Sequence, residues 1–195
     1  MSAALAVLVT AIALERLLRA GITFDEPLHL DGIKGVLAMA GRVLAGEAVD
    51  YRSIPGDYEY YGIGTLLPAY GLAELLGLLL PWPEIFRWSA ALHLLAQASF
   101  LVCLWSCWRV LRPQGRATAA LATASLALLP EFLGHGLMNY KDMPVAAGVM
   151  LCLQATLAFH RQPGPRTLAA VGLSVVWLAT QKLAAATLVL PCLAV

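Results

Sequence analysis

Long apolar runs constrain the fold of this chain more than any other feature. Several approach the roughly 20 residues that a helix needs to cross a bilayer. Apolar residues fill 60% of 195 positions, 13% are charged, and the mean hydropathy is +0.75, so a soluble domain is excluded. We predict an all-α membrane protein, a polytopic bundle of transmembrane helices forming one domain over residues 1–195. The apolar segments are 2–20, 61–80, 85–108, 117–133, 143–159, 167–181 and 183–195.

The first and last runs differ from the others. Residues 2–20 have no positive n-region and no evident cleavage site, which indicates a retained span rather than a signal peptide. Residues 183–195 are apolar to the final position but too short for a span. We therefore expect this chain to be the N-terminal part of a longer protein, truncated and inactive on its own.

Charge, cysteine and histidine content narrow the function classes. The formal net charge is +1 and no basic cluster contains interleaved aromatic residues, so no nucleic-acid partner is expected. Cys103 and Cys107 share a helix face, but no second Cys or His pair at ligand spacing completes a zinc site. We predict neither a metal nor a cofactor. His93 is interpreted as a core or pore-facing residue and His160 as an interfacial one.

Arginine residues predict the orientation in the membrane. Two short connections between apolar runs carry arginine and no acidic residue, so both should be cytoplasmic by the positive-inside rule. The connections at 134–142 and 181–182 then lie outside. The arginines are Arg109, Arg112, Arg116, Arg161 and Arg166.

The side occupied by residues 21–60 depends on segment 61–80. If this segment crosses the membrane, residues 21–60 are cytoplasmic, which charge counting favours. If it stays at the surface, residues 21–84 form one external loop with juxtamembrane helices. Its four glycines, Pro68 and Glu74 favour the second arrangement, since a lipid-exposed helix rarely carries so many helix breakers. The residues alone leave both arrangements open.

An acidic pair follows the first apolar run. After it, apolar residues repeat at helical spacing and predict an amphipathic helix along the membrane surface. Asp25 can be the N-cap of that helix, and Thr23 with Glu26 fits a capping box. Alternatively, the two carboxylates supply a general base with His29 nearby. The apolar repeat consists of Leu30, Ile33, Leu37, Ala40 and Leu44.

A second polar cluster precedes the run at 143–159. Asp142, followed by Pro144, can cap the next helix. Yet so many polar groups at a membrane boundary often mark a functional site. Further on, Lys182 either extends its charge towards water at a helix end or binds a phosphate. The cluster contains His135, Asn139, Tyr140, Lys141 and Asp142.

In order and spacing, these motifs resemble the GT-C superfamily of glycosyltransferases. Asp25-Glu26 precedes an amphipathic helix, Asp142 precedes a later span, and Thr180-Gln181-Lys182 forms a Thr-x-Lys. The nearest relatives are the protein O-mannosyltransferase and aminoarabinose-transferase branch, glycosyltransferase family 39. The resemblance covers the whole chain as the N-terminal portion of such an enzyme. The first loop has no His-Pro-Pro of the O-mannosyltransferase kind, which argues against a protein acceptor.

The resemblance implies a fold, an activity and a location. It implies a GT-C-like module whose first loop, residues 21–84, is extracytoplasmic and faces the same side as Asp142. The implied enzyme is inverting and metal-independent. It moves a sugar from a polyprenyl-phosphate donor to an unidentified acceptor on the extracytoplasmic face of the membrane. In a bacterium, this membrane would be the inner membrane.

The resemblance also implies roles for individual residues. Asp25 matches the acid that binds or deprotonates the acceptor, Glu26 is its neighbour in the motif, and Asp142 matches the second-loop acid. Lys182 resembles a lysine near the lipid phosphate. The substrate-binding residues expected are His29, His135, Asn139, Lys141 and Lys182.

Two other function classes fit the same residues. In a transporter or channel subunit, the acids and Lys182 would line a pathway. In a non-catalytic membrane assembly protein, the acids would only cap helices.

Overall fold

Every regular element of the described chain in the computed structural model is a helix. The structure describes residues 11, 21–23, 25–50, 63–182, 185 and 187, so the spans expected at 2–20 and 183–195 lie almost entirely outside the described residues. The all-α prediction is confirmed for the part described. The helices are α2 (Glu26–Leu44), α3 (Leu66–Leu79), α4 (Glu84–Leu111), η2 (Arg112–Gln114), α5 (Arg116–Leu128), α6 (Pro130–Met138), α7 (Met143–Arg161) and α8 (Pro165–Gln181).

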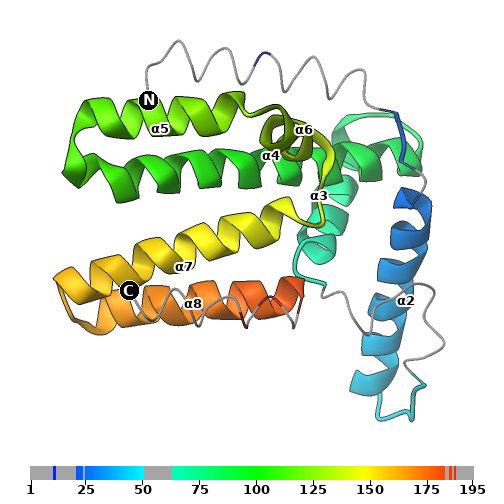
Figure 1. The fold of residues 1–195 in the computed structure, drawn as a ribbon. Helices are drawn as coiled ribbons and strands as arrows, with labels where there is room; N and C mark the ends of the chain where they lie inside the picture. Colours follow the sequence, from blue (N-terminus) through cyan, green and yellow to red (C-terminus); the bar gives the residue numbers. More distant parts are fainter. Residues whose placement is uncertain are drawn as a thin grey trace.

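Helix α4 is the centre of the arrangement. It packs against α3, α5, α6 and α7, and α8 packs against α7. Figure 1 shows α4, α5, α7 and α8 running side by side, with α2 and α3 lying across one end of them. By length and composition, α4 with η2 and α7 can cross a membrane, and α5 with α6 would be a third span if counted together. These helices are consistent with a membrane protein.

The span expected at 117–133 is broken. Helices α5 and α6 meet at Leu129 and differ in direction by 67°. Pro130 begins α6, and the preceding residue is extended, with φ −65° and ψ 116°. The ring of a proline disfavours the helical region for the residue before it and cannot supply a backbone N–H. Pro130 therefore explains why one apolar run forms two helices.

Segment 61–80 contains a short helix. Helix α3 has 14 residues, which gives a length of about 21 Å, against a hydrocarbon core of about 30 Å. Figure 1 shows α3 lying across one end of the longer helices. Helix α3 is thus shorter than a full membrane crossing, and the side of the membrane occupied by residues 21–60 stays a prediction.

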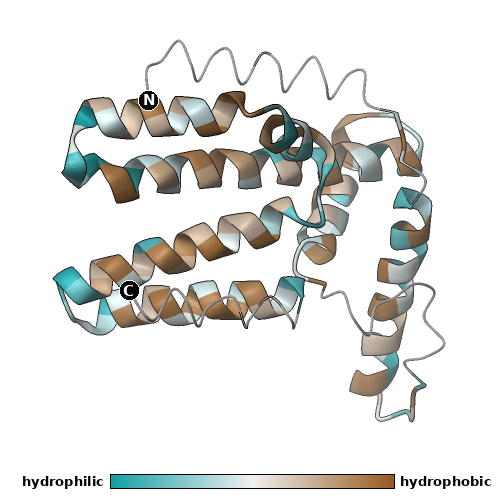
Figure 2. Ribbon diagram, in the orientation of Figure 1, coloured by the Kyte–Doolittle hydropathy of each residue, from teal (hydrophilic) through white to brown (hydrophobic). Residues whose placement is uncertain are grey.

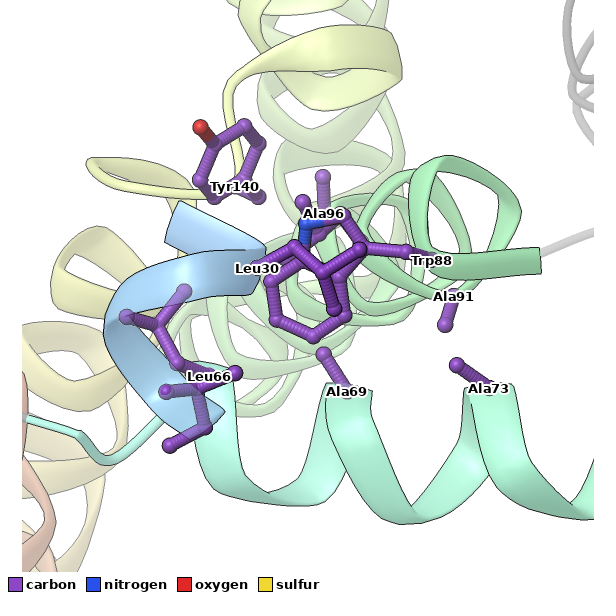
Figure 3. Packing of buried hydrophobic residues seen from close by; sticks show 10 residues of the cluster. Leu30, Leu66, Ala69, Ala73, Trp88, Ala91, Ala96 and Tyr140 are labelled. Atoms are coloured by element: carbon purple, nitrogen blue, oxygen red, sulfur yellow. The ribbon is translucent and has the colours of Figure 1, made fainter. Parts of the chain in front are cut away.

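A buried cluster joins α2, α3 and α4. Trp88 of α4 is fully buried in it, and its indole Nε1 donates a 2.9 Å hydrogen bond to the backbone carbonyl of Glu26. Small residues let α3 approach closely: Ala69 lies beneath the Trp88 ring, and Ala73 faces Ala91 (Figure 3). The start of α2 is therefore held against the most deeply packed part of α4.

Polar residues separate to the two ends of the bundle. Figure 2 shows hydrophilic residues at the α4–α5 and α7–α8 connections, at one end. A second hydrophilic region lies near the junction of α6 and α7, at the other end. Apolar side chains cover the helices between them, as expected for helices in contact with lipid.

Glycine is required where α6 crosses α4. A Cβ added at Gly136 would lie 2.4 Å from Cδ2 of Phe100 and 2.9 Å from its Cβ. We expect Gly136→Ala to lower the free energy of unfolding by about 1–3 kcal/mol through overpacking. The measurement is chemical unfolding in detergent micelles.

Gly134 provides the matched control, because it lies in the same helix and a Cβ there meets nothing within 4 Å. We expect Gly134→Ala to be neutral or mildly stabilising, since alanine favours a helix. Equal stability of the two variants would contradict this close approach.

Candidate functional site

Asp25 and Asp142 occupy the N-cap positions predicted from the sequence, at the starts of α2 and α7. In each case the side chain makes no hydrogen bond to the first turn of the helix. The predicted position is therefore confirmed, but side-chain capping is not. The carboxylate oxygens are directed to other side chains, which are described next.

Asp25 pairs with a lysine 116 residues away in sequence. Lys141 donates through Nζ to Oδ2 of Asp25, and the Thr23 hydroxyl donates to Oδ1 at 3.0 Å. Nζ of Lys141 also lies 5.9 Å from the centre of the Tyr140 ring. These contacts attach the segment before α2 to the connection between α6 and α7.

Asp142 makes an equivalent pair with the second predicted lysine. Nζ of Lys182 donates to Oδ1 of Asp142 at 2.9 Å, and Nδ2 of Asn139 lies 3.0 Å from Oδ2. The same Asn139 nitrogen lies 2.8 Å from Nδ1 of His135. Asn139 therefore connects the carboxylate to an imidazole.

Contacts between the segment just before α3 and the end of α8 fix the position of Lys182. The backbone N–H of Gly64 donates to the carbonyl of Thr180 at 2.8 Å, and Thr65 donates through its hydroxyl to Gln181. A Cβ on Gly64 would lie 2.8 Å from that same carbonyl oxygen, so only glycine fits this approach. The Thr-x-Lys segment is thereby held beside the first loop.

The lysines keep both acids ionised. Burial, the largest single contribution, would raise the pKa of each carboxyl. Hydrogen bonds outweigh it, from Lys141 and Thr23 to Asp25 and from Lys182 and Asn139 to Asp142, together with the lysine charges. The pKa of each acid therefore lies below its ordinary value of 3.8.

The two pairs meet at a cavity of about 540 Å³ beside the connection between α6 and α7. Asp25, Lys141 and Asp142 line it, and Lys182 reaches it through its bond to Asp142. The other lining residues are Thr23, Glu131, Gly134, His135, Met138, Asn139 and Tyr140. The structure thus brings together six of the eight predicted site residues.

Glu26 and His29 lie outside that group. Glu26 is fully buried, and its Oε1 lies 3.0 Å from Nε2 of His93, itself only 1% exposed. Burial raises the pKa of Glu26 most, but hydrogen bonding, above all to His93, outweighs it and holds the pKa below 4.5. Glu26 therefore anchors α2 to α4 instead of facing the cavity.

His29 is close to the site without lining the cavity. Its Nε2 lies 3.9 Å from Oδ2 of Asp25, and its ring meets Tyr140 edge to face at 5.8 Å. The site prediction left out five of the residues that line the cavity: Thr23, Glu131, Gly134, Met138 and Tyr140. A signal for Glu131 existed in the Pro130 break, which turns the start of α6 towards the loop.

Comparison with known proteins gives no match among protein-family models, curated proteins or solved structures. Interpretation of the cavity therefore depends on its own residues and their geometry.

The Glu26–His93 pair has a testable energetic role. We expect His93→Leu to lower the free energy of unfolding by about 3–5 kcal/mol, because it leaves a carboxylate buried without its partner. The double variant Glu26→Leu/His93→Leu should recover much of this loss, since replacing both partners removes the buried charge. Chemical unfolding in detergent micelles measures both.

His160→Leu is the control for the pair. His160 is exposed on the last turn of α7, so its replacement should change stability little. A double variant as unstable as His93→Leu would contradict the explanation by a buried charge.

Proposed function

We propose that this chain is part of a glycosyltransferase that moves a sugar from a polyprenyl-phosphate donor to an acceptor at the external membrane surface. One observation carries the proposal. Two carboxylates from distant parts of the sequence, Asp25 and Asp142, meet at one cavity, and each is paired with a lysine. The reaction needs both types of group, a proton acceptor and a cation for phosphate.

In this reaction a carboxylate acts as the general base that removes a proton from the acceptor. The acceptor's oxygen or nitrogen attacks the anomeric carbon of the sugar and loses its proton. The bond from that carbon to the phosphate oxygen breaks, and polyprenyl phosphate leaves with the electron pair. Asp25, lying 36% exposed at the cavity, is the base that takes the proton.

The lysines stabilise the negative charge of the phosphate leaving group. A sugar phosphodiester carries one negative charge, and the departing phosphate monoester gains a second, so Lys182 and Lys141 stabilise the products more than the substrate. Stabilisation of charge that develops during reaction accelerates the chemical step. A lysine that turns towards phosphate also releases its carboxylate, and the pKa of that acid then rises towards that of a better base.

Substitution of the acids tests the proposal. We expect Asp25→Asn to lower sugar transfer by about 10²–10⁴-fold through loss of the base. Asp142→Asn should also lower transfer, because Lys182 loses the group that positions it. The assay uses polyprenyl phosphate carrying radiolabelled mannose or aminoarabinose and follows release of the lipid phosphate.

Asp31→Asn provides the control, because Asp31 is exposed on α2 and does not line the cavity. Its activity should equal that of the parent protein. Full activity in Asp25→Asn with normal expression would remove Asp25 as the base.

Transport is a second candidate function, favoured by the 67° break between α5 and α6. Broken helices often form substrate sites in transporters. The side reached by single cysteines separates the two functions. In a cysteine-free background, we expect Asp50→Cys and Met138→Cys to react from one side and Gln162→Cys from the other. A membrane-impermeant maleimide reports each side.

Each labelling result separates the glycosyltransferase proposal from the transport proposal. Reaction of positions 50 and 138 from opposite faces would rule out a single site containing Asp25 and Asp142. Reaction of position 138 from both faces, together with solute flux into proteoliposomes, would favour transport.

A further inference from the structure

A second cavity lies at the end of the bundle away from the acids. It has a volume of about 340 Å³ and is lined by Arg109, Arg112, Pro113 and Arg161. Arg109 lies in the last turn of α4, Arg112 begins η2, and Arg161 is the last residue of α7. Every charged residue lining this cavity is therefore a cation.

Nothing nearby in the sequence balances these charges. The chain has no Asp or Glu between Glu84 and Glu131, and none after Asp142. Within the described ranges, none of the three arginines forms an ion pair. Arg109 is instead held beside an aromatic face, with Cζ 5.7 Å from the centre of the Trp105 ring.

Helix ends do not compensate this positive charge. Helices α4 and α7 end here with about −0.5 charge each, but α5 and α8 begin at the same end with about +0.5 each. The charges of the three guanidinium groups are therefore not offset by helix dipoles. An anion entering this cavity would relieve that repulsion.

The length of α7 sets the depth of the cavity in the membrane. Asp142 precedes α7 and Arg161 ends it, and 19 residues extend about 28 Å. This length is close to the hydrocarbon thickness of about 30 Å. The arginines therefore lie at the membrane face opposite the acids, at the level of lipid phosphates, where the half-exposed Trp105 suits the interface.

We propose that this arginine cavity binds a phosphate group, as carried by an anionic phospholipid headgroup or by free phosphate. Guanidinium groups present paired donors that match phosphate oxygens. Basic pockets between membrane helices on the cytoplasmic side are suited to such headgroups. This proposal is independent of the proposed sugar transfer, because it uses none of the residues at the cavity beside Asp25 and Asp142.

Lipid titration followed by native mass spectrometry tests the proposal on the 195-residue chain in detergent. Phosphatidylglycerol should bind at least about tenfold more tightly than phosphatidylcholine. Arg109→Gln/Arg161→Gln should lose at least about tenfold of that affinity. If the double variant does not fold, the exposed Arg112→Gln should show the same direction of change.

A second double variant provides a matched control. Arg116→Gln/Arg166→Gln removes the same charge from the same end of the bundle, but neither residue lines the cavity. Its affinity for phosphatidylglycerol should stay close to that of the parent. Equal loss in the two double variants would overturn the proposal, because general surface charge would then explain binding.

Competition with inorganic phosphate distinguishes a lipid headgroup from free phosphate as the source of the bound group. Displacement of phosphatidylglycerol by millimolar phosphate would support a site open to free phosphate. Retention of the lipid would support a headgroup site. Equal affinity for phosphatidylglycerol and phosphatidylcholine, with no binding of inorganic phosphate, would overturn both the headgroup site and the free-phosphate site.

Discussion

The buried contact between Glu26 and His93 is the interaction on which the site geometry depends. It fixes the first turn of α2 against α4, and the indole of Trp88 holds the backbone at the same point. Asp25 is the residue immediately before, so its carboxylate is placed by a neighbour that never reaches the cavity. The acidic pair thus divides its roles: one member anchors the loop, and the other faces the site.

Each acid at the cavity lies beside a lysine. Lys141 pairs with Asp25 and Lys182 pairs with Asp142, and Glu131 is a further acid in the cavity lining. Any anionic ligand must therefore compete with a carboxylate for its lysine. In the proposed sugar transfer, this competition would couple phosphate binding to the release of a carboxylate base.

Sequence patterns predicted what depends on local chemistry and missed what depends on distant contacts. Hydropathy gave the helices, and the concentration of polar groups before α7 identified most of the cavity. The Asp25–Lys141 pairing was not predictable, because 116 residues separate the partners. The same holds for Glu26, whose assignment to catalysis assumed that adjacent acids act together; helix geometry instead turns it towards His93. The break at Pro130 was visible in the sequence, but hydropathy averaged over the run concealed it.

The two ends of the bundle use different cations, and the difference has a physical reason. A lysine is a point charge on a flexible stem, so Lys182 can exchange a carboxylate for a phosphate with little loss of geometry. An arginine binds phosphate through paired donors in a fixed plane, which favours a persistent contact. Lysines therefore suit the proposed sugar transfer at the cavity beside Asp25 and Asp142, and arginines suit the proposed phosphate site at the opposite end. Helix α7 runs from Asp142 to Arg161, so a phosphate held at Arg161 would also restrain the end of the helix at which Asp142 lies.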